Sequence, residues 1–206
     1  MNMTKTILVL GTSSRSGRGV IVRSRTGFTL IETMIAITIL TLSISGPLLG
    51  ASRALVLAEI SRDQLTASYL AQEGIEYVRA MRDDAYLRSY QAGGTDISGA
   101  AWTDFMSGAS AWSITQCITR DCTLDPTRAM GYGNTLALNA YSGDAPLYVS
   151  SGIYTQQQVG TRTEFTRTVR VAVVGADEVS VTSVVSWSFH NITYTTSVID
   201  HLTPWQ

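Results

Sequence analysis

The chain has 206 residues, of which 45% are hydrophobic and 15% are charged, and its formal net charge is −1. The charged fraction lies well below the roughly 25% of ordinary soluble domains, which predicts a membrane segment or a β domain rich in serine and threonine. Residues 1–27 hold five cationic residues and no acidic one, whereas residues 28–206 hold 10 basic and 16 acidic residues. Outside this basic N-terminal segment, no basic patch indicates nucleic-acid binding.

The apolar run from Phe28 to Leu49 follows the basic segment and contains 22 residues with one charge, Glu32. As a helix it would be about 33 Å long at about 1.5 Å per residue, which is enough to cross the apolar core of a bilayer. Because the cations precede it, the positive-inside tendency places the N-terminus in the cytoplasm and the later residues outside. We therefore expect a single-pass protein of the inner (cytoplasmic) membrane, with residues 1–27 as a basic leader and residues 28–50 as a transmembrane helix half.

Glu32 needs an explanation, because a carboxylate within a membrane costs about 2.5–3.5 kcal/mol on insertion scales and usually has a partner. One interpretation places it near the interface, where its side chain reaches water. A second makes residues 1–52 an ordinary secretory signal, with Gly50 and Ser52 in a small-x-small cleavage pattern, although its head and apolar core are long for a signal. A third takes Glu32 together with the residues before it, as the motif Gly-Phe-Thr-Leu-Ile-Glu that begins at Gly27.

This motif resembles the processing site of type IV prepilins and of type II secretion pseudopilins, with the glycine, the aromatic residue and the acid placed at the start of an apolar helix. The resemblance implies that a membrane-embedded prepilin peptidase cuts after Gly27, methylates the new N-terminal residue Phe28 and leaves the apolar segment in place. It also implies that the chain assembles with other pilin or pseudopilin subunits. The leader, residues 1–27, is longer than many in that family.

Elementary electrostatics fits a role for Glu32 in such an assembly. Cleavage exposes an α-amine whose ordinary pKa is about 7.7–8.0, and the amine of an incoming subunit can meet Glu32 of its neighbour. A paired charge in lipid or in a dry filament core is far less costly than a lone one, and the pairing would set the axial register. Gly27 has no Cβ, so a peptidase can approach its backbone closely. We therefore expect Gly27 and Phe28 to act in processing and Glu32 in assembly.

The helix is expected to continue beyond the membrane, over residues 51–88. Gly46 and Pro47 should bend or locally melt it, because Pro47 removes an i−4 hydrogen bond. In residues 51–88, apolar positions recur at a three- and four-residue spacing and predict a stripe that faces a sheet, with interruptions at Asp63 and Gly74. The stripe consists of Val56, Ile60, Ala67, Leu70, Tyr77 and Met81. Residues 69–86 are similar to the same helix part in V-type minor pilins and I-type minor pseudopilins, which favours a minor component.

Residues 89–206 are predicted to form an extracytoplasmic head. Residues 89–112 indicate a long loop with one short element, and residues 129–160 a second loop-like stretch with a short strand at 146–150. The only cysteines, Cys117 and Cys122, predict a local disulfide, because the segment lies outside the cytoplasm. A metal site is the alternative, but it lacks a second ligand pair, and the spacing is not the C-x-x-C of thiol redox sites.

The last third of the chain gives the clearest β signal. Residues 162–203 alternate between apolar and polar side chains in three runs joined by short links at 176–178 and 190–191, which predicts an antiparallel meander. Phe165, Arg167 and Val169 share one face of the first run. One long helix with a C-terminal antiparallel sheet is an α+β fold, and it resembles the pilin fold, in which the sheet packs on the second half of the helix.

Nothing in the sequence points to an enzyme, a cofactor or a metal. His190 lies in a predicted turn and His201 near the C-terminus, and both are interpreted as exposed polar residues. Asp83-Asp84 and Asp177-Glu178 are interpreted as a helix end and a turn, since their spacing is not that of a calcium loop. Asn191 begins a glycosylation sequon by pattern only.

Two functions follow from these patterns. The first is a minor pilin or pseudopilin, processed by the peptidase and assembled through its N-terminal helix, in a surface pilus, a DNA-uptake pilus or a secretion pseudopilus. The alternative is a secreted or membrane-anchored β-domain binding module, an adhesin, whose N-terminus is an ordinary signal or anchor.

Overall fold

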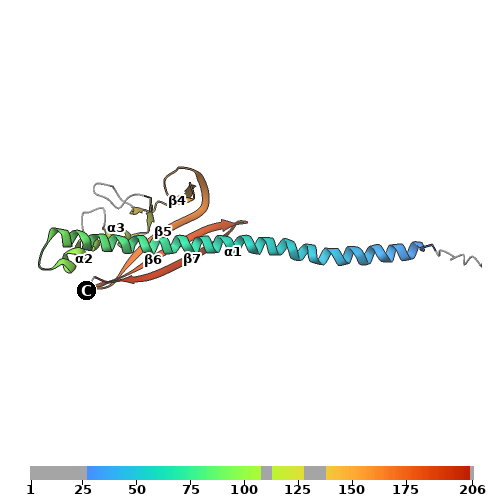
Figure 1. Ribbon diagram of the computed structural model, residues 1–206, viewed down its shortest axis with the longest axis horizontal. Coiled ribbons are helices and arrows are strands. Elements are labelled where there is room, and N and C mark those ends of the chain that lie inside the picture. Colours follow the sequence, from blue (N-terminus) through green and yellow to red (C-terminus); the bar gives the residue numbers. More distant parts are fainter. Residues whose placement is uncertain (1–26, 108–112, 128–137, 205–206) are drawn as a thin grey trace, which may run out of the picture. The chain divides into compact units, whose positions relative to one another are not determined.

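A computed structural model of the chain describes residues 27–107, 113–127 and 138–204, and Figure 1 shows its elements. The chain divides into two compact units, residues 1–50 and 51–206, which are described separately. The elements in chain order are α1 (Leu30–Ala92), α2 (Ile97–Ser107), α3 (Thr115–Thr119), β1 (Cys122–Leu124), β2 (Leu138–Ala140), β3 (Pro146–Ser150), β4 (Ile153–Thr155), β5 (Thr161–Gly175), β6 (Glu178–Phe189) and β7 (Ile192–Leu202). Residues 1–26 of the predicted leader lie outside the described residues, as do residues 129–137 of the second predicted loop.

Helix α1 runs from Leu30 to Ala92 and contains both residues of the predicted break. Gly46 and Pro47 keep helical backbone, so the helix does not end or melt there, and a bend at this point stays a prediction. An internal proline costs about 3 kcal/mol, which one long helix with many remaining hydrogen bonds can tolerate. The helix ends four residues later than expected, where Gly93 adopts a positive φ of 72°.

The second unit contains one antiparallel seven-stranded sheet with β5 at its centre. One edge of β5 pairs with β6, and the other pairs with both β1 and β3. The predicted C-terminal meander is confirmed as β5, β6 and β7 (Figure 1), and the predicted short strand at 146–150 is β3. The turn between β6 and β7 has positive φ at His190 (48°) and Asn191 (62°), as a two-residue primed turn requires.

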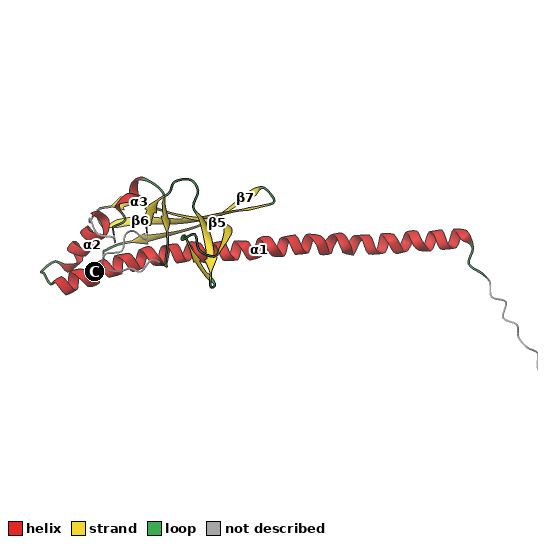
Figure 2. Cartoon of the chain, turned by 90° about the horizontal axis from the view of Figure 1, so that it is seen from above, coloured by secondary structure: helices red, strands yellow, loops and turns green. Residues whose placement is uncertain are grey.

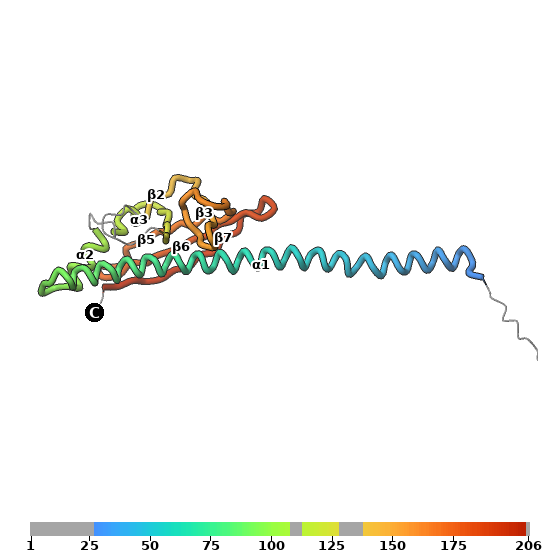
Figure 3. Tube along the Cα trace, turned by 45° about the horizontal axis from the view of Figure 1, so that its top comes forward, coloured from blue at the N-terminus to red at the C-terminus, as the bar shows by residue number. Residues whose placement is uncertain are grey.

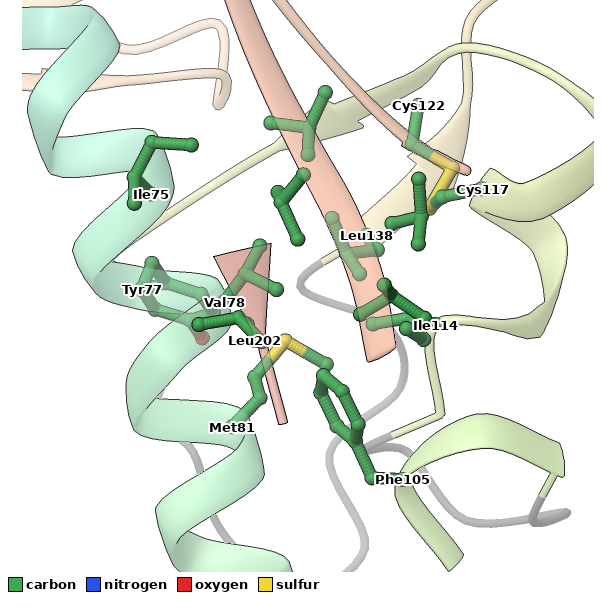
Figure 4. Close-up of a cluster of buried hydrophobic side chains, with 14 of the residues drawn as sticks. Ile75, Tyr77, Val78, Met81, Phe105, Ile114, Cys117, Cys122, Leu138 and Leu202 are labelled. Carbon is green, nitrogen blue, oxygen red and sulfur yellow. A yellow bond between two sulfur atoms is a disulfide. The ribbon is translucent and has the colours of Figure 1, made fainter. Parts of the chain in front are cut away.

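The second half of α1 lies along the sheet together with α2 and α3 (Figures 2 and 3). Of the predicted apolar stripe, Ala67, Leu70, Tyr77 and Met81 are buried, whereas Val56 is 40% exposed. Figure 4 shows Tyr77 and Met81 of α1 close to Phe105 of α2 in one buried cluster, which also holds the two cysteines. The short element expected within residues 89–112 is therefore an 11-residue helix, α2, which buries Trp102 and Phe105.

A polar layer lies in the core where α1 meets β5 and β6. Arg167 of β5 is fully buried, and its guanidinium donates to the carbonyl oxygen of Leu70 at 3.0 Å, to that of Leu124 at 2.9 Å and to Glu73 Oε2 at 2.5 Å. Burial lowers the pKa of Arg167 below its ordinary value, and the carboxylate of Glu73 opposes that shift. Gly74 of α1 faces the same layer, where a Cβ would overlap Ser183 Oγ of β6.

Two arginine side chains of α1 contact the C-terminal end of the chain, one on β7 and one just after it. Arg79 donates to Asp200 Oδ2 at 2.8 Å, and this hydrogen bond raises the pKa of the Arg79 guanidinium. Arg82 donates to the carbonyl oxygen of Thr203 at 3.2 Å. Burial also raises the pKa of Tyr77 on the same helix, with the charges of Asp125 and Asp84 adding to it. The two arginine contacts link α1 to residues 200–203.

Candidate processing and assembly site

The residues predicted for processing lie directly ahead of α1. Gly27 and Phe28 have no regular secondary structure, and Phe28 is 79% exposed. No atom of the described residues lies within 4 Å of the position that a Cβ would take at Gly27. The packing of the described residues therefore does not require a glycine at position 27.

Thr29 begins the helix and brings Glu32 into its first turn. The Thr29 Oγ1 atom accepts a hydrogen bond from the backbone N–H of Glu32 at 3.3 Å, and the Thr29 carbonyl accepts one from Thr33 at 3.2 Å. This is the arrangement of an N-cap threonine with a glutamate at the third helical position, the residue pair of a capping box. An acid at this position is also favoured by the helix dipole. This local role of Glu32 was not predicted from the sequence, although the pattern Thr-x-x-Glu before an apolar run could have indicated it.

The part of α1 that follows is apolar and exposed. All described residues of the first unit, 27–50, are exposed, including large side chains such as Ile31 (65%) and Leu42 (74%). Within the described part of the chain, α1 is the one helix long and apolar enough to cross a membrane, by its length and composition. An apolar surface this large needs a cover of lipid or of other helices.

The hydroxyl groups in this apolar segment are satisfied within the helix. Each of five side chains donates to a carbonyl oxygen three or four residues earlier, at distances between 2.7 and 3.0 Å. They are Thr33, Thr38, Thr41, Ser43 and Ser45. Such bonds leave no hydroxyl of this group in need of water, so the polar residues of the segment are compatible with a lipid environment.

The predicted disulfide is present between Cys117 of α3 and Cys122 of β1. Both cysteines are fully buried in the larger apolar cluster (Figure 4), so the bridge fastens α3 to the sheet. In this disulfide neither sulfur is a free thiol. No group of three His, Cys, Asp or Glu side chains that could hold a metal ion occurs within residues 27–107, 113–127 and 138–204.

The other polar residues that the sequence singled out do not come together. His190 is exposed in the turn before β7, whereas His201, at the far end of β7, approaches Glu178 Oε1 with its Nδ1 atom at 2.6 Å. Asp83 pairs with Arg82 at 2.8 Å on α1. These residues are surface contacts of the head and form no common site.

A family model described as the prokaryotic N-terminal methylation motif matches residues 22–46. The chain carries a type IV prepilin-like N-terminus. The match ends within α1 and does not extend to the head, and no curated protein and no solved structure matches the chain. The prepilin-like N-terminus with its long apolar helix, followed by an antiparallel sheet, is a pilin-like α+β arrangement. The motif implies processing by a prepilin peptidase and assembly with other pilins, and the V-type or I-type subtype stays a prediction.

Proposed function

We propose that this chain is a minor pilin or pseudopilin, a structural subunit of a type IV pilus or of a type II secretion pseudopilus. The observation that carries the proposal is the methylation motif at residues 22–46. This motif includes Gly27, where a Cβ would meet no described atom, and the Thr29-capped start of a long, exposed apolar helix. Prepilin peptidase cuts after Gly27 and methylates Phe28, and α1 stays attached as anchor and later as filament core. The similarity of residues 69–86 to minor components supports the minor role.

The proposed topology has the leader in the cytoplasm and the head on the far side of the inner membrane. The cations of residues 1–27 support this orientation, because positive charge is retained on the cytoplasmic side. The buried disulfide between Cys117 and Cys122 also supports it, because such bonds persist in oxidising compartments outside the cytoplasm.

Glu32 is the proposed assembly residue. Its carboxylate lies in the first turn of α1 and is exposed, four positions after the residue whose amine the cut at Gly27 would free. In a filament the carboxylate would pair with the α-amine of a neighbouring subunit, because a lone carboxylate among apolar helices is costly. The head then serves as the surface of the subunit, with a structural and not a catalytic role.

The test is the mature N-terminus, measured by mass spectrometry on protein from its native membrane. We expect N-methylated Phe28 as the first residue, and we expect Gly27→Val to leave the chain uncut. An N-terminus at Arg53, or an uncut Met1, would instead favour the membrane-anchored or secreted binding module and would remove Glu32 from any assembly role.

A further inference from the structure

Helix α1 starts shortly after the bond proposed for cleavage, the one between Gly27 and Phe28. Gly27, Phe28 and Thr29 have no regular secondary structure, and the helix begins at Leu30. The Thr29 carbonyl oxygen accepts the backbone N–H of Thr33 at 3.2 Å. Among the described residues, the carbonyl oxygens of Gly27 and Phe28 accept no backbone hydrogen bond. The hydrogen-bond ladder of α1 therefore begins two residues after the glycine.

The side chain of Thr29 stabilises the helix start at this position. Its Oγ1 atom accepts the backbone N–H of Glu32 at 3.3 Å, which is the hydrogen bond of an N-cap residue. An N-cap residue has non-helical backbone angles, and the residues before it lie outside the helix. A cap at position 29 therefore keeps both Gly27 and Phe28 out of the helix.

The sequence contains a competing helix start at Gly27. Glycine is about as favourable at the N-cap position as threonine, whereas Phe28 has no side-chain acceptor. If Gly27 were the N-cap, its carbonyl oxygen would accept the backbone N–H of Ile31, because the N-cap carbonyl receives the first bond of the helix. Position 29 would then lie inside the first turn. The residue at position 29 thus determines which of the two starts is favoured.

The competing start would alter the carbonyl group at which cleavage occurs. In the hydrolysis, water adds to the Gly27 carbonyl carbon and the bond to the Phe28 nitrogen breaks. The nitrogen takes up a proton and leaves as an amine, and Gly27 ends as a carboxylate. While the carbon is tetrahedral, its oxygen carries negative charge and needs hydrogen-bond donors of the peptidase. An oxygen that is bonded to the N–H of Ile31 in a helical turn is held away from such donors.

We propose that Thr29 is a positioning residue for the peptidase, because its cap keeps the Gly27 carbonyl group outside the helix. The inference rests on the proposed function, in which prepilin peptidase cuts after Gly27. Thr29 acts through the backbone and does not itself take part in the reaction. The peptidase binds chains whose helix starts at Leu30, so a population with the start at Gly27 raises the apparent KM and leaves kcat unchanged.

Three substitutions at position 29 separate the cap from the hydroxyl group. Thr29→Ser keeps a capping side chain, and Thr29→Gly removes the hydroxyl but keeps a residue that suits the N-cap. Thr29→Ala removes the cap and introduces the strongest helix former, which favours the start at Gly27. Alanine is more informative than valine, because the lower helix propensity of valine favours fraying of the first turn over its extension.

The assay is cleavage of the full chain in mild detergent by solubilised membranes that contain prepilin peptidase, followed by mass spectrometry. Replacing a capping residue by alanine shifts a helix-start equilibrium by about fivefold. We therefore expect Thr29→Ala to raise KM about two- to fivefold while kcat stays unchanged. Thr29→Ser and Thr29→Gly should match the wild type in both constants.

Amide hydrogen exchange of the uncut chain, without peptidase, gives a second measurement. With the start at Leu30, the N–H of Ile31 is one of the donors without a partner inside the helix, whereas the start at Gly27 gives it one. We expect the Ile31 amide to exchange more slowly in Thr29→Ala than in Thr29→Gly, by about twofold or more. A faster Glu32 amide with an unchanged Ile31 amide would show fraying in place of extension and would overturn the proposal.

The outcomes separate this proposal from the function on which it rests. A wild-type chain that is not cut at Gly27 would refute the proposed function itself. A wild type cut at Gly27, with Thr29→Ala cut equally well, would refute the role of Thr29 alone. If Thr29→Gly were cut as poorly as Thr29→Ala, or if kcat fell while KM stayed unchanged, the peptidase would depend on the hydroxyl group and not on the helix start.

Discussion

The buried guanidinium of Arg167 allows a graded prediction about how the head is attached to α1. Arg167→Ala removes the donors to two backbone carbonyls, those of Leu70 and Leu124, and leaves a cavity where the long side chain was. Each lost charged hydrogen bond contributes about 1.5–3 kcal/mol, but the desolvation cost of the buried cation disappears with it. We expect a net loss of about 2–4 kcal/mol in the free energy of unfolding.

Two companion variants separate the contributions at this position. Arg167→Met keeps most of the volume but supplies no donor, so its loss should be smaller, about 1–2 kcal/mol. Glu73→Gln keeps an acceptor for the guanidinium and removes its counter-charge. Because the Glu73 side chain is 41% exposed, water already screens the pair, and we expect a loss of about 1–2 kcal/mol.

The measurement is urea unfolding of the full chain in mild detergent with its disulfide intact, followed by near-ultraviolet circular dichroism. The expected order of destabilisation places Arg167→Ala above both Arg167→Met and Glu73→Gln. If Arg167→Met were more stable than the wild type, the hydrogen bonds to Leu70 and Leu124 would not offset the burial of the cation. The role assigned to this layer would then be wrong.

Three further changes test the helix start and its contact with the sheet. Glu32→Ala should leave membrane insertion intact and abolish incorporation into filaments, measured by fractionation, and normal incorporation would remove the assembly role. Thr29→Val should weaken the helix start by about 1 kcal/mol while Thr29→Ser preserves it, so helical content near the N-terminus, read by amide exchange, should fall in the first variant only. Gly74→Ala should cost about 1–3 kcal/mol in urea unfolding because its Cβ overlaps Ser183, and Ser183→Gly in the same chain should recover part of that loss.

The sequence predicted the elements whose periodicity is long and regular. The helix-facing alternation of β6 and the turn at His190 and Asn191 are local signals, and the meander that they predict is the one observed. The extent of α2 was missed because its segment is rich in Gly, Ser and Ala, and its helix depends on burying Trp102 and Phe105. Burial of that kind is set by partners elsewhere in the chain, which no short window of sequence contains.

The polar layer of the core shows the same limit more sharply. Arg167 falls on the apolar face of β5, and Gly74 interrupts the apolar stripe of α1. Each residue therefore breaks the apolar periodicity of its own element. Arg167 and Glu73 are separated by 94 positions in the chain, and only the fold brings them within 2.5 Å. Ser183 of β6 belongs to the same layer, and its hydroxyl group occupies the space beside Gly74 where a Cβ would otherwise lie. The interruptions in three separate elements are thus one feature, which explains why none could be interpreted from its own segment.

Two interactions compete for the Glu32 carboxylate: one with the N-terminus of its own helix, and one with the α-amine of a neighbouring subunit. Glu32 occupies the third helical position behind the Thr29 cap, where the unpaired N–H groups and the positive end of the helix dipole favour an acid within a single subunit. The pairing proposed for the filament uses the same carboxylate to bind the amine of another subunit. The net gain from assembly is therefore the difference between the two environments and not the full strength of an ion pair. Such a difference suits a subunit that must be stable in the membrane before assembly and must still gain from joining a filament.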